Sequence, residues 1–316
     1  MSRSRAQPIV LTSRVPADAR GETLLAFLSR RFRYHDREAW LAQLSQGRVQ
    51  LDGAPADGTE LLRAGAVLRY EKDHREPPVD ARFRVLHEDA HLLVVDKPAH
   101  LPMHADGPFL RNTLIHLLRD AYGQELQLVH RLDRETSGVC IVARDKATQA
   151  AVQEQFGAAL KKRYLAVVQG VVAGPFVCDE PVGHHPTSEV RLRRSAAPGA
   201  LRPQEARTEV TPVEAGPSRT LVACAPTTGR THQLRAHLEH RGHPILGDKL
   251  YGSPDDRYLE FVRHVKAGGS VFEERDGAPN RQLLHASSVT FRHPGDGRLV
   301  TYEAPTPDEF ARWLLS

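Results

Sequence analysis

The hydrophobic pattern of the N-terminal quarter predicts two short helices and a small sheet. Apolar residues recur at helical spacing over 22–32 and again over 37–46, where Gly47 suits the left-handed turn that ends a helix. Residues 48–53 alternate as a strand does and run into an Asp-Gly turn, and residues 67–70 predict a further strand. This quarter of the chain therefore has the pattern of a compact α+β module.

Beyond the adjacent prolines at 77–78, strand patterns outnumber helical ones. The predicted strands cover 83–87, 91–96, 139–143, 164–168 and 221–225. The predicted helices cover 112–122, 145–156 with Asp145 as the cap, and a segment from Gly229 to about Gly242. Because helices and strands do not alternate regularly, the pattern argues against a doubly wound sheet. It predicts a mixed α+β domain with a mostly antiparallel sheet and flanking helices.

The length of 316 residues fits two domains. We expect an N-terminal module over 1–76, a linker over 77–82 and a larger domain over 83–316. Within the larger domain, residues 183–207 and 253–281 have the composition of loops and are expected to be surface insertions. The sequence leaves their role open.

Composition narrows the class of partner. Lysine plus arginine exceed aspartate plus glutamate by 43 − 39 = 4, and 36 of the 43 cations are arginine, whose planar fork binds phosphates and bases. Residues 1–50 hold nine arginines against four acids, which favours an anionic partner. No apolar run approaches 18 residues and the first residues do not resemble a secretory signal. The three cysteines are too widely spaced for a disulfide framework or a zinc knuckle, so we expect a cytoplasmic protein.

Two clusters of polar residues carry candidate chemistry. In the first, residues 130–138, three cations or potential cations surround Asp133 directly before a buried strand. Such neighbours keep a carboxylate ionised, which suits a nucleophile or a hydrogen-bond anchor better than a general acid. In the second, residues 227–235, Arg230 lies where a strand turns into a helix, a place that attracts anions. Taken alone, each cluster also fits a structural role, as an ion pair and as an ordinary helix start.

Four motifs in this order make the larger domain resemble the RluA-type RNA pseudouridine synthases. They are His130–Gly138, Lys162–Ala166, Gly229–Arg235 and Leu284-His285-Ala286, with further matches at 96–98, 102–104 and 242–248. The likeness spans about residues 83–304. It implies an isomerase that converts RNA uridine to pseudouridine in a cleft of a mixed sheet, with no cofactor and no metal. The family usually has glycine where this chain has His100, a departure that concerns a loop near the cleft.

The resemblance also implies roles for individual residues. Asp133 would be the essential catalytic residue, Tyr164 would stack on the target base, and Arg230 would pair with the catalytic carboxylate. Leu284 would pack against the base, and Arg131 would fill the gap that the flipped uridine leaves in the RNA. The remaining substrate-binding candidates lie in the same motifs: His130, Thr231, His232 and Gln233. Whether Asp133 attacks the ribose, stabilises an oxocarbenium-like state or removes a proton stays open.

The N-terminal module resembles the small RNA-binding module named for ribosomal protein S-four. The resemblance rests on residues 46–53 and 65–67, while the start at 20–22 departs from the family pattern. It implies phosphate contacts by four arginines, Arg30, Arg31, Arg33 and Arg48, and therefore RNA binding that weakens steeply with salt. The expected substrate is structured RNA, of the large ribosomal subunit or alternatively transfer RNA. We expect a monomer.

Two rival interpretations stay open at this point. A catalytically inactive RNA-binding protein would keep the basic module but not the chemistry. A metal-dependent hydrolase could use His237, His240 and His243, which recur every third residue on the last predicted helix. The sequence does not say which uridine is modified.

Overall fold

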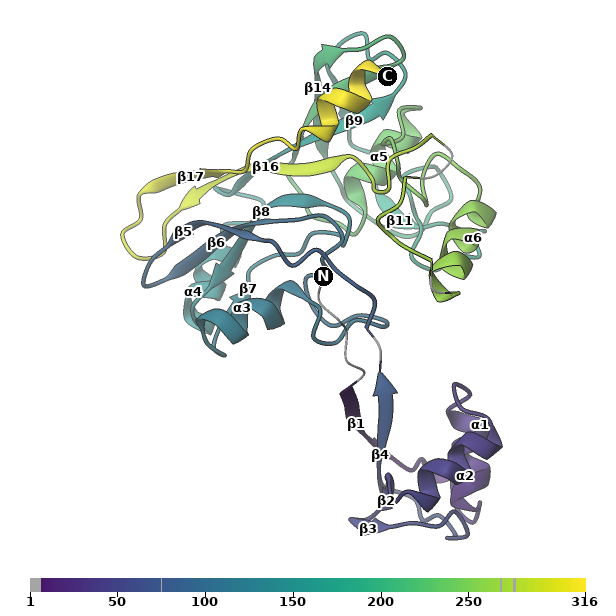
Figure 1. The fold of residues 1–316 in the computed structure, drawn as a ribbon. Helices are drawn as coiled ribbons and strands as arrows, with labels where there is room; N and C mark the ends of the chain where they lie inside the picture. The colour runs from purple at the N-terminus through teal and green to yellow at the C-terminus, as the bar shows by residue number, and fades with distance from the viewer. Residues whose placement is uncertain (1–6, 75, 268, 275–276) are drawn as a thin grey trace. The chain divides into compact units, whose positions relative to one another are not determined.

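The structure is a computed structural model that describes residues 7–74, 76–267, 269–274 and 277–316. The basic start of the chain, Met1–Arg5, and residues 268 and 276 of the second predicted insertion lie outside the described residues. The chain forms two compact units, and the boundary between them in the sequence falls between Pro77 and Pro78 (Figure 1). No described helix is long and apolar enough to cross a membrane.

The N-terminal unit packs two helices against a small antiparallel sheet. Its elements are β1 (Gln7–Arg14), a 3-10 turn (Ala17–Ala19), α1 (Leu24–Arg31), α2 (Arg37–Ser45), β2 (Val49–Leu51), β3 (Ala54–Pro55) and β4 (Val67–His74). The strand order is β1-β4-β2-β3. Thr23 and Asp36 cap the two helices, whose apolar faces meet Trp40 and Leu68 in one core. The helices and the last two predicted strands are confirmed, whereas the edge strand β1 is an element that the sequence analysis does not predict.

The C-terminal unit is built on one mixed sheet of ten strands in the described residues. They are β5 (Arg84–Glu88), β6 (Leu92–Lys97), β7 (Gln127–Leu128), β8 (Ser137–Ala143), β9 (Lys161–Gln169), β10 (Phe176–Cys178), β14 (Thr208–Ala215), β15 (Arg219–Pro226), β16 (Leu284–Arg292) and β17 (Leu299–Glu303). The main path is β10-β14-β15-β9-β16-β8-β6-β5, with β17 beside β16 and β7 beside β8. Each pairing is antiparallel except that of β8 with β16. The mixed, mostly antiparallel α+β prediction is confirmed.

The parallel pair places the candidate site. Because β8 and β16 run in the same direction, the segments that precede them, 130–136 and 281–283, lie at the same end of the sheet. Gly138 opens β8 with φ +110°, and a Cβ atom there would lie 2.2 Å from the carbonyl oxygen of Ala286. Tyr164 on β9 pairs with the same Ala286. A close backbone approach that only glycine permits therefore brings the first motif beside the fourth, and the fourth pairs on its other edge with the second.

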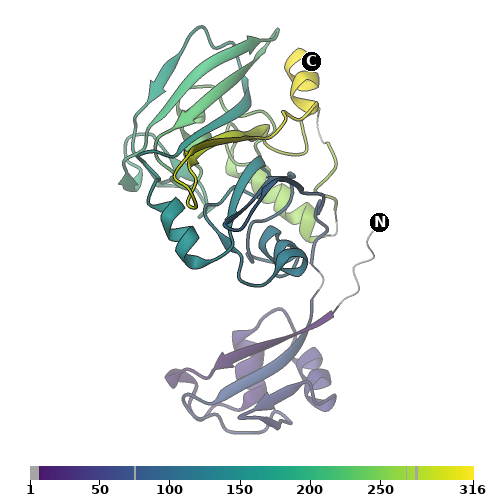
Figure 2. The ribbon, with the colours of Figure 1, turned by 90° about the vertical axis from the view of Figure 1, so that its left-hand side faces the viewer.

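Helices cover both faces of this sheet (Figure 2). They are α3 (Leu114–Tyr122), α4 (Lys146–Gln153), α5 (Gln233–His240), α6 (Asp255–Lys266) and α7 (Glu309–Leu315). Leu114 and Leu118 of α3 pack on Leu93 and Val95, whereas Val152 of α4 packs with Leu92 on the opposite face of the same strands. The predicted helix over 145–156 ends at Gln153, earlier than expected. Cys140, Cys178 and Cys224 are free and buried.

The prediction that two stretches are surface loops is wrong. Residues 183–207 contribute to a three-stranded sheet of β11 (Val182–His184), β12 (Arg194–Ser195) and β13 (Leu201–Gln204), and residues 253–281 contain α6. Arg193 is largely buried and bridges Glu239 of α5 and Asp255 of α6. One of the five arginines of residues 183–207 is therefore an internal tie to α5 and α6.

Candidate active site

A cleft of about 390 Å³ opens where the four motifs converge. It is lined by all nine residues that the sequence analysis assigns to catalysis or substrate binding in the C-terminal unit. They come from the segment before β8, from β9, from the junction of β15 with α5, and from the start of β16. The volume suits a small planar molecule held in a partly apolar pocket.

Asp133 lies on the floor of the cleft and is held by Arg235. Nη1 of Arg235 donates to Oδ2 of Asp133 at 2.8 Å, while its Nε and Nη2 donate to both oxygens of Asp248 at 2.6 and 2.9 Å. The Asp248 side chain is fully buried, and its Oδ1 also accepts the backbone N–H groups of Leu250 and Tyr251. One guanidinium thus joins two carboxylates in a fixed geometry. The predicted partner Arg230 does not take this place.

The charges around Asp133 favour its ionised form. Burial raises the pKa of this carboxyl group, whereas the neighbouring His232 and Arg235 lower it, and the pKa is below its ordinary value. Burial and Arg235 in turn lower the pKa of His232 to about 4, so this imidazole is neutral near pH 7. Its Nε2 lies 3.8 Å from Oδ2 of Asp133. The lasting positive charge that faces Asp133 is therefore that of Arg235.

An aromatic and an aliphatic side chain line the same cleft as the carboxylate. Tyr164 is half-buried on β9, and Leu284 is buried at the start of β16. Burial raises the pKa of the Tyr164 phenol above its ordinary value, so the ring is neutral. Lys162 lines the same cleft, with its ammonium over the Phe156 ring at 5.2 Å. Together, Tyr164 and Leu284 offer a flat apolar surface beside one ionised carboxylate.

The loop between β15 and α5 is held by Gln233. Its Oε1 accepts from the backbone N–H of Arg230 and the hydroxyl of Thr228, and its Nε2 donates to Arg207 and Thr208. The amide predicted to bind substrate is thus engaged by protein groups and fixes the loop. Arg230 itself is exposed and donates through Nε to the carbonyl of Glu205, beside the exposed Thr231. His232 precedes α5 with a left-handed φ of 56° and meets the hydroxyl of Tyr251 at 3.0 Å.

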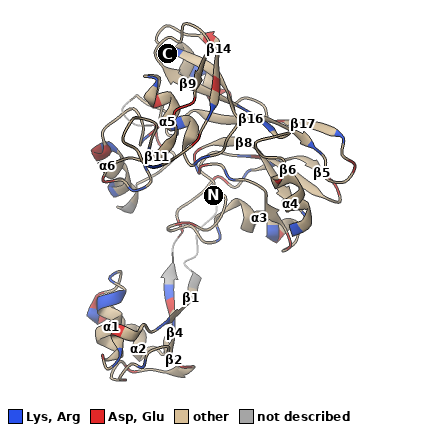
Figure 3. Ribbon diagram, turned by 180° about the vertical axis from the view of Figure 1, so that it is seen from behind, with Lys and Arg blue, Asp and Glu red and all other residues tan. Residues whose placement is uncertain are grey.

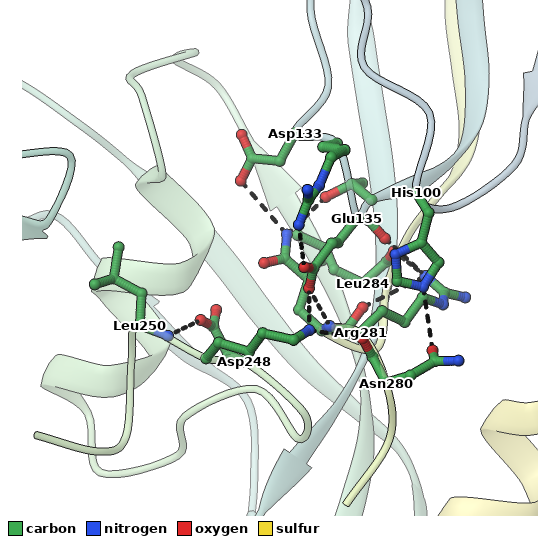
Figure 4. Close-up of polar contacts among 12 residues, drawn as sticks. His100, Asp133, Glu135, Asp248, Leu250, Asn280, Arg281 and Leu284 are labelled. Atoms are coloured by element: carbon green, nitrogen blue, oxygen red, sulfur yellow. Dashed lines mark hydrogen bonds and ion pairs between the residues drawn. The ribbon is translucent and has the colours of Figure 1, made fainter. Parts of the chain in front are cut away.

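A second buried network supports the segment that carries Asp133 (Figure 4). Glu135 accepts from Lys249 at 2.8 Å, and these and neighbouring positive charges hold its pKa below the ordinary range despite burial. Arg281 donates to the carbonyls of Glu135 and Leu284, which ties the segment before β8 to the start of β16. Gln282 donates to the Thr136 hydroxyl at 2.9 Å and approaches Oδ2 of Asp133 at 3.4 Å. This network fixes the direction of the Asp133 carboxylate.

The departure at His100 lies in a backbone conformation that glycine adopts readily. His100 has a left-handed φ of 61°, a conformation that favours glycine. Its buried ring packs edge-on against Phe272, and its Nε2 meets the side-chain oxygen of Asn280 at 3.2 Å. Both partners belong to the stretch expected to be a surface loop. Contacts of the imidazole therefore compensate for the strain at this position.

Known proteins are similar to this chain over most of its length. The family model described as RNA pseudouridylate synthase matches residues 91–240. The ribosomal large subunit pseudouridine synthase D of Xanthomonas campestris pv. campestris is 34% identical over 312 residues, which cover 95% of this chain and 90% of that protein. The ribosomal large subunit pseudouridine synthase C of Escherichia coli O157:H7 is 32% identical and covers 97% of this chain and 96% of its own. This chain belongs to the RNA pseudouridine synthase family.

The solved structure of human RNA pseudouridylate synthase domain containing 1 agrees with this assignment. It is 27% identical, has a TM-score of 0.57, and covers 76% of this chain and 89% of its own. The resemblance to the RluA type that the motifs indicated is thereby confirmed, and the chain is an RNA pseudouridine synthase, an isomerase. The rival hydrolase loses its ligand set, because His237 faces Thr208 and Glu180 through its two ring nitrogens and His243 faces Gln169.

The sequence analysis of this pseudouridine synthase missed the residues that hold Asp133. Arg235 is the last residue of the motif Gly229–Arg235, inside the predicted helix, and Asp248 is the last residue of the match at 242–248. Their charge was the available signal, since a buried helix face rarely carries an unpaired arginine. His130 accepts the backbone N–H of Ile141 through Nε2, and burial lowers its pKa to about 4. It lines the cleft but also holds the β8 backbone.

Proposed function

We propose that this synthase converts a uridine of large-subunit ribosomal RNA to pseudouridine, with Asp133 as the catalytic residue. The observation that carries the proposal is a single ionised carboxylate, tied to Arg235, in a cleft that also presents Tyr164 and Leu284. The relatives from Xanthomonas and Escherichia are both named as large-subunit enzymes, which supports this RNA over transfer RNA.

The geometry divides the work among the side chains. Asp133 meets the ribose of the flipped uridine and assists cleavage of the bond between its carbon 1′ and uracil nitrogen 1, as carboxylates do in glycoside hydrolysis. The detached uracil turns against Tyr164 and Leu284, and carbon 5 forms the new bond to the ribose while its hydrogen leaves as a proton. Arg131, exposed at the rim, occupies the gap in the RNA stack. The isomerisation consumes no cofactor and transfers no electrons to another molecule.

The N-terminal unit supplies affinity for structured RNA in this proposal. Arg31 and Arg33 are exposed at the end of α1, Arg30 is half-exposed and pairs with Glu22, and Arg48 lies 3.8 Å from Glu71. Figure 3 shows Lys and Arg positions at α1 in blue. Such cations bind phosphates in a salt-dependent manner. Removing residues 1–77 should weaken binding to large-subunit RNA by at least about tenfold, with turnover at saturating RNA retained. An equal loss of turnover at saturation would contradict this division. The enzyme would act as a monomer in the cytoplasm.

Tritium release from RNA labelled at uridine carbon 5 tests the function. Wild type should release tritium from large-subunit RNA and not from transfer RNA, in the presence of a chelator. Asp133→Asn should fold and bind RNA but release tritium at least about 10³-fold more slowly, because the isosteric amide carries no charge. Asp120→Asn, on the exposed side of α3, is the matched control and should behave as wild type. Release by Asp133→Asn at a rate near wild type would refute the assignment.

A further inference from the structure

A second group of converging polar side chains lies away from the cleft. His87 and Asp89 belong to β5 and the turn that joins it to β6, and His293 begins the turn between β16 and β17. Figure 1 shows β5 and β17 as neighbours at the end of the sheet remote from α5. His293 follows Leu284 by nine positions along β16, roughly 30 Å at the rise of an extended strand. This group therefore takes no part in the uridine chemistry.

In the turn between β5 and β6, the backbone binds only one of the two carboxylate oxygens of Asp89. Oδ1 of Asp89 accepts the backbone N–H groups of His91 and Leu92, both at 2.7 Å. Oδ2 is left to face the two imidazoles, at 2.9 Å from Nε2 of His87 and 2.8 Å from Nε2 of His293. These three atoms all lie within 4.8 Å of one another. The geometry is that of two nitrogens and one oxygen around a common point.

One of these nitrogens lacks a hydrogen bond. His293 is 9% exposed, and its buried Nε2 has no hydrogen-bond partner among the described residues, although Oδ2 of Asp89 lies 2.8 Å away. A buried polar atom without a partner costs free energy and calls for an explanation. On its other side, Nδ1 accepts from the N–H of Gly295 at 3.2 Å and lies 3.7 Å from Oδ1 of Asp296. That second carboxylate is placed to orient a metal-bound imidazole.

We infer that His87, Asp89 and His293 bind a divalent transition-metal ion, Zn²⁺ in particular, with water as the fourth ligand. Bonds of 2.0–2.2 Å in a tetrahedron require ligand atoms about 3.3 Å apart, close to the spacing already present around Oδ2. Two imidazoles with one carboxylate suit zinc and its neighbours rather than magnesium or calcium. Binding displaces the proton from Nε2 of His293 to Nδ1, which then no longer accepts from Gly295 and instead directs its N–H toward Asp296. The ion would cross-link the ends of two hairpins.

Metal titration of the full-length, tag-free protein tests this site. After removal of metals with a chelator, the protein should bind one Co²⁺ with the visible absorption of a tetrahedral site, and Zn²⁺ should displace it. Zn²⁺ at about 100 times its Kd should raise the Tm of the C-terminal unit by about 5–10 °C. His87→Gln should weaken binding at least tenfold and abolish the rise in Tm. Because His87 is one-third exposed, this variant should keep the fold. Tritium release should be unchanged, so the result is independent of the proposed function.

The control is His240→Gln, from the histidine group on α5, and it should bind Co²⁺ as wild type does. His293→Gln supplies a second ligand variant, expected to lose the absorption band as His87→Gln does. Absence of a tetrahedral band in wild type, equal binding by His87→Gln and wild type, or loss of binding only in His240→Gln would each overturn the inference.

Discussion

Arginine serves opposite purposes in the two units. In the C-terminal unit, the Arg235 side chain is 10% exposed, donates to two carboxylates and lies 4.8 Å from the centre of the Tyr251 ring. In the N-terminal unit, Arg31 and Arg33 are exposed at the end of a helix, and the side chain of Arg30 is 51% exposed. A buried guanidinium sets the geometry and ionisation of one group, whereas an exposed one adds affinity that salt screens. In the proposed function, the two units thus divide chemistry from binding.

The two units also differ in how closely other atoms approach their glycines, and this difference predicts the largest effect on stability. Gly138→Ala would place a methyl group 2.2 Å from a carbonyl oxygen, at a positive φ, and should destabilise the C-terminal unit by more than about 4 kcal/mol. Gly47→Ala in the N-terminal unit also has a positive φ but meets no atom within 4 Å, so it should cost about 1 kcal/mol. Urea unfolding of each unit measures both. Similar costs for the two variants would contradict the close approach of β8 to β16.

Replacing the buried guanidinium comes next in size. Arg235→Met leaves the fully buried Asp248 and the cleft residue Asp133 without their shared partner, and should destabilise the unit by about 3–5 kcal/mol. Arg230→Met removes one exposed hydrogen bond to a carbonyl and should cost about 1 kcal/mol or less. Denaturant unfolding of the two variants side by side decides which arginine holds the carboxylates. Equal costs would restore the pairing expected from the sequence.

The expected pairing of Arg230 with Asp133 is a part of the site that the sequence did not predict correctly. The order of the motifs, through the family resemblance, was enough to place Asp133, Tyr164 and Leu284 in one cleft. It selected Arg230 as the partner of Asp133, whereas the arginine that pairs with Asp133 is Arg235, five positions later in the same motif. The choice depends on His232, whose left-handed backbone delays the start of α5 to Gln233 and leaves Arg235 on the buried side of the helix. Local spacing does not reveal such a turn.

The same limit applies to the two stretches read as loops. Their polar composition concealed β11–β13 and α6, because the residues that bury them are supplied by distant parts of the chain. Arg193 is satisfied by Glu239 and Asp255, and Asn280 by His100 and Phe272. A polar segment whose partners lie 46 or 180 positions away has no local signature of burial. Strands with continuous apolar runs, such as β6 and β8, were predicted because the apolar run itself indicates that the strand is buried.

The pH dependence of tritium release distinguishes a buried Asp133–Arg235 ion pair from a titrating His232. The pKa of Asp133 is lowered in the folded protein, and its ion pair contributes stability above the unfolded-state pKa of about 3.9. The ionised form and this stability are therefore lost only as the pH falls through the lower folded value. We therefore expect tritium release in single turnovers to stay flat from pH 8 to about pH 5. In Arg235→Lys, which keeps a charge but loses the fork, the acidic limb should move upward. A wild-type limb near pH 6.5 would instead implicate an ionised His232.

The smallest effect should come from the exposed arginines. Arg31→Gln and Arg33→Gln should each weaken binding to large-subunit RNA several-fold and reduce the slope of log K against log salt by about 0.7–0.9, since each removes one phosphate contact. Turnover at saturating RNA should not change, because neither side chain lies in the unit that holds Asp133. Arg298→Gln, exposed in the C-terminal unit and paired with Asp296, is the matched control and should leave the slope unchanged. Filter binding between 50 and 300 mM salt measures the slopes. A slope that responds to Arg298 and not to Arg31 or Arg33 would move the phosphate-binding surface to the catalytic unit.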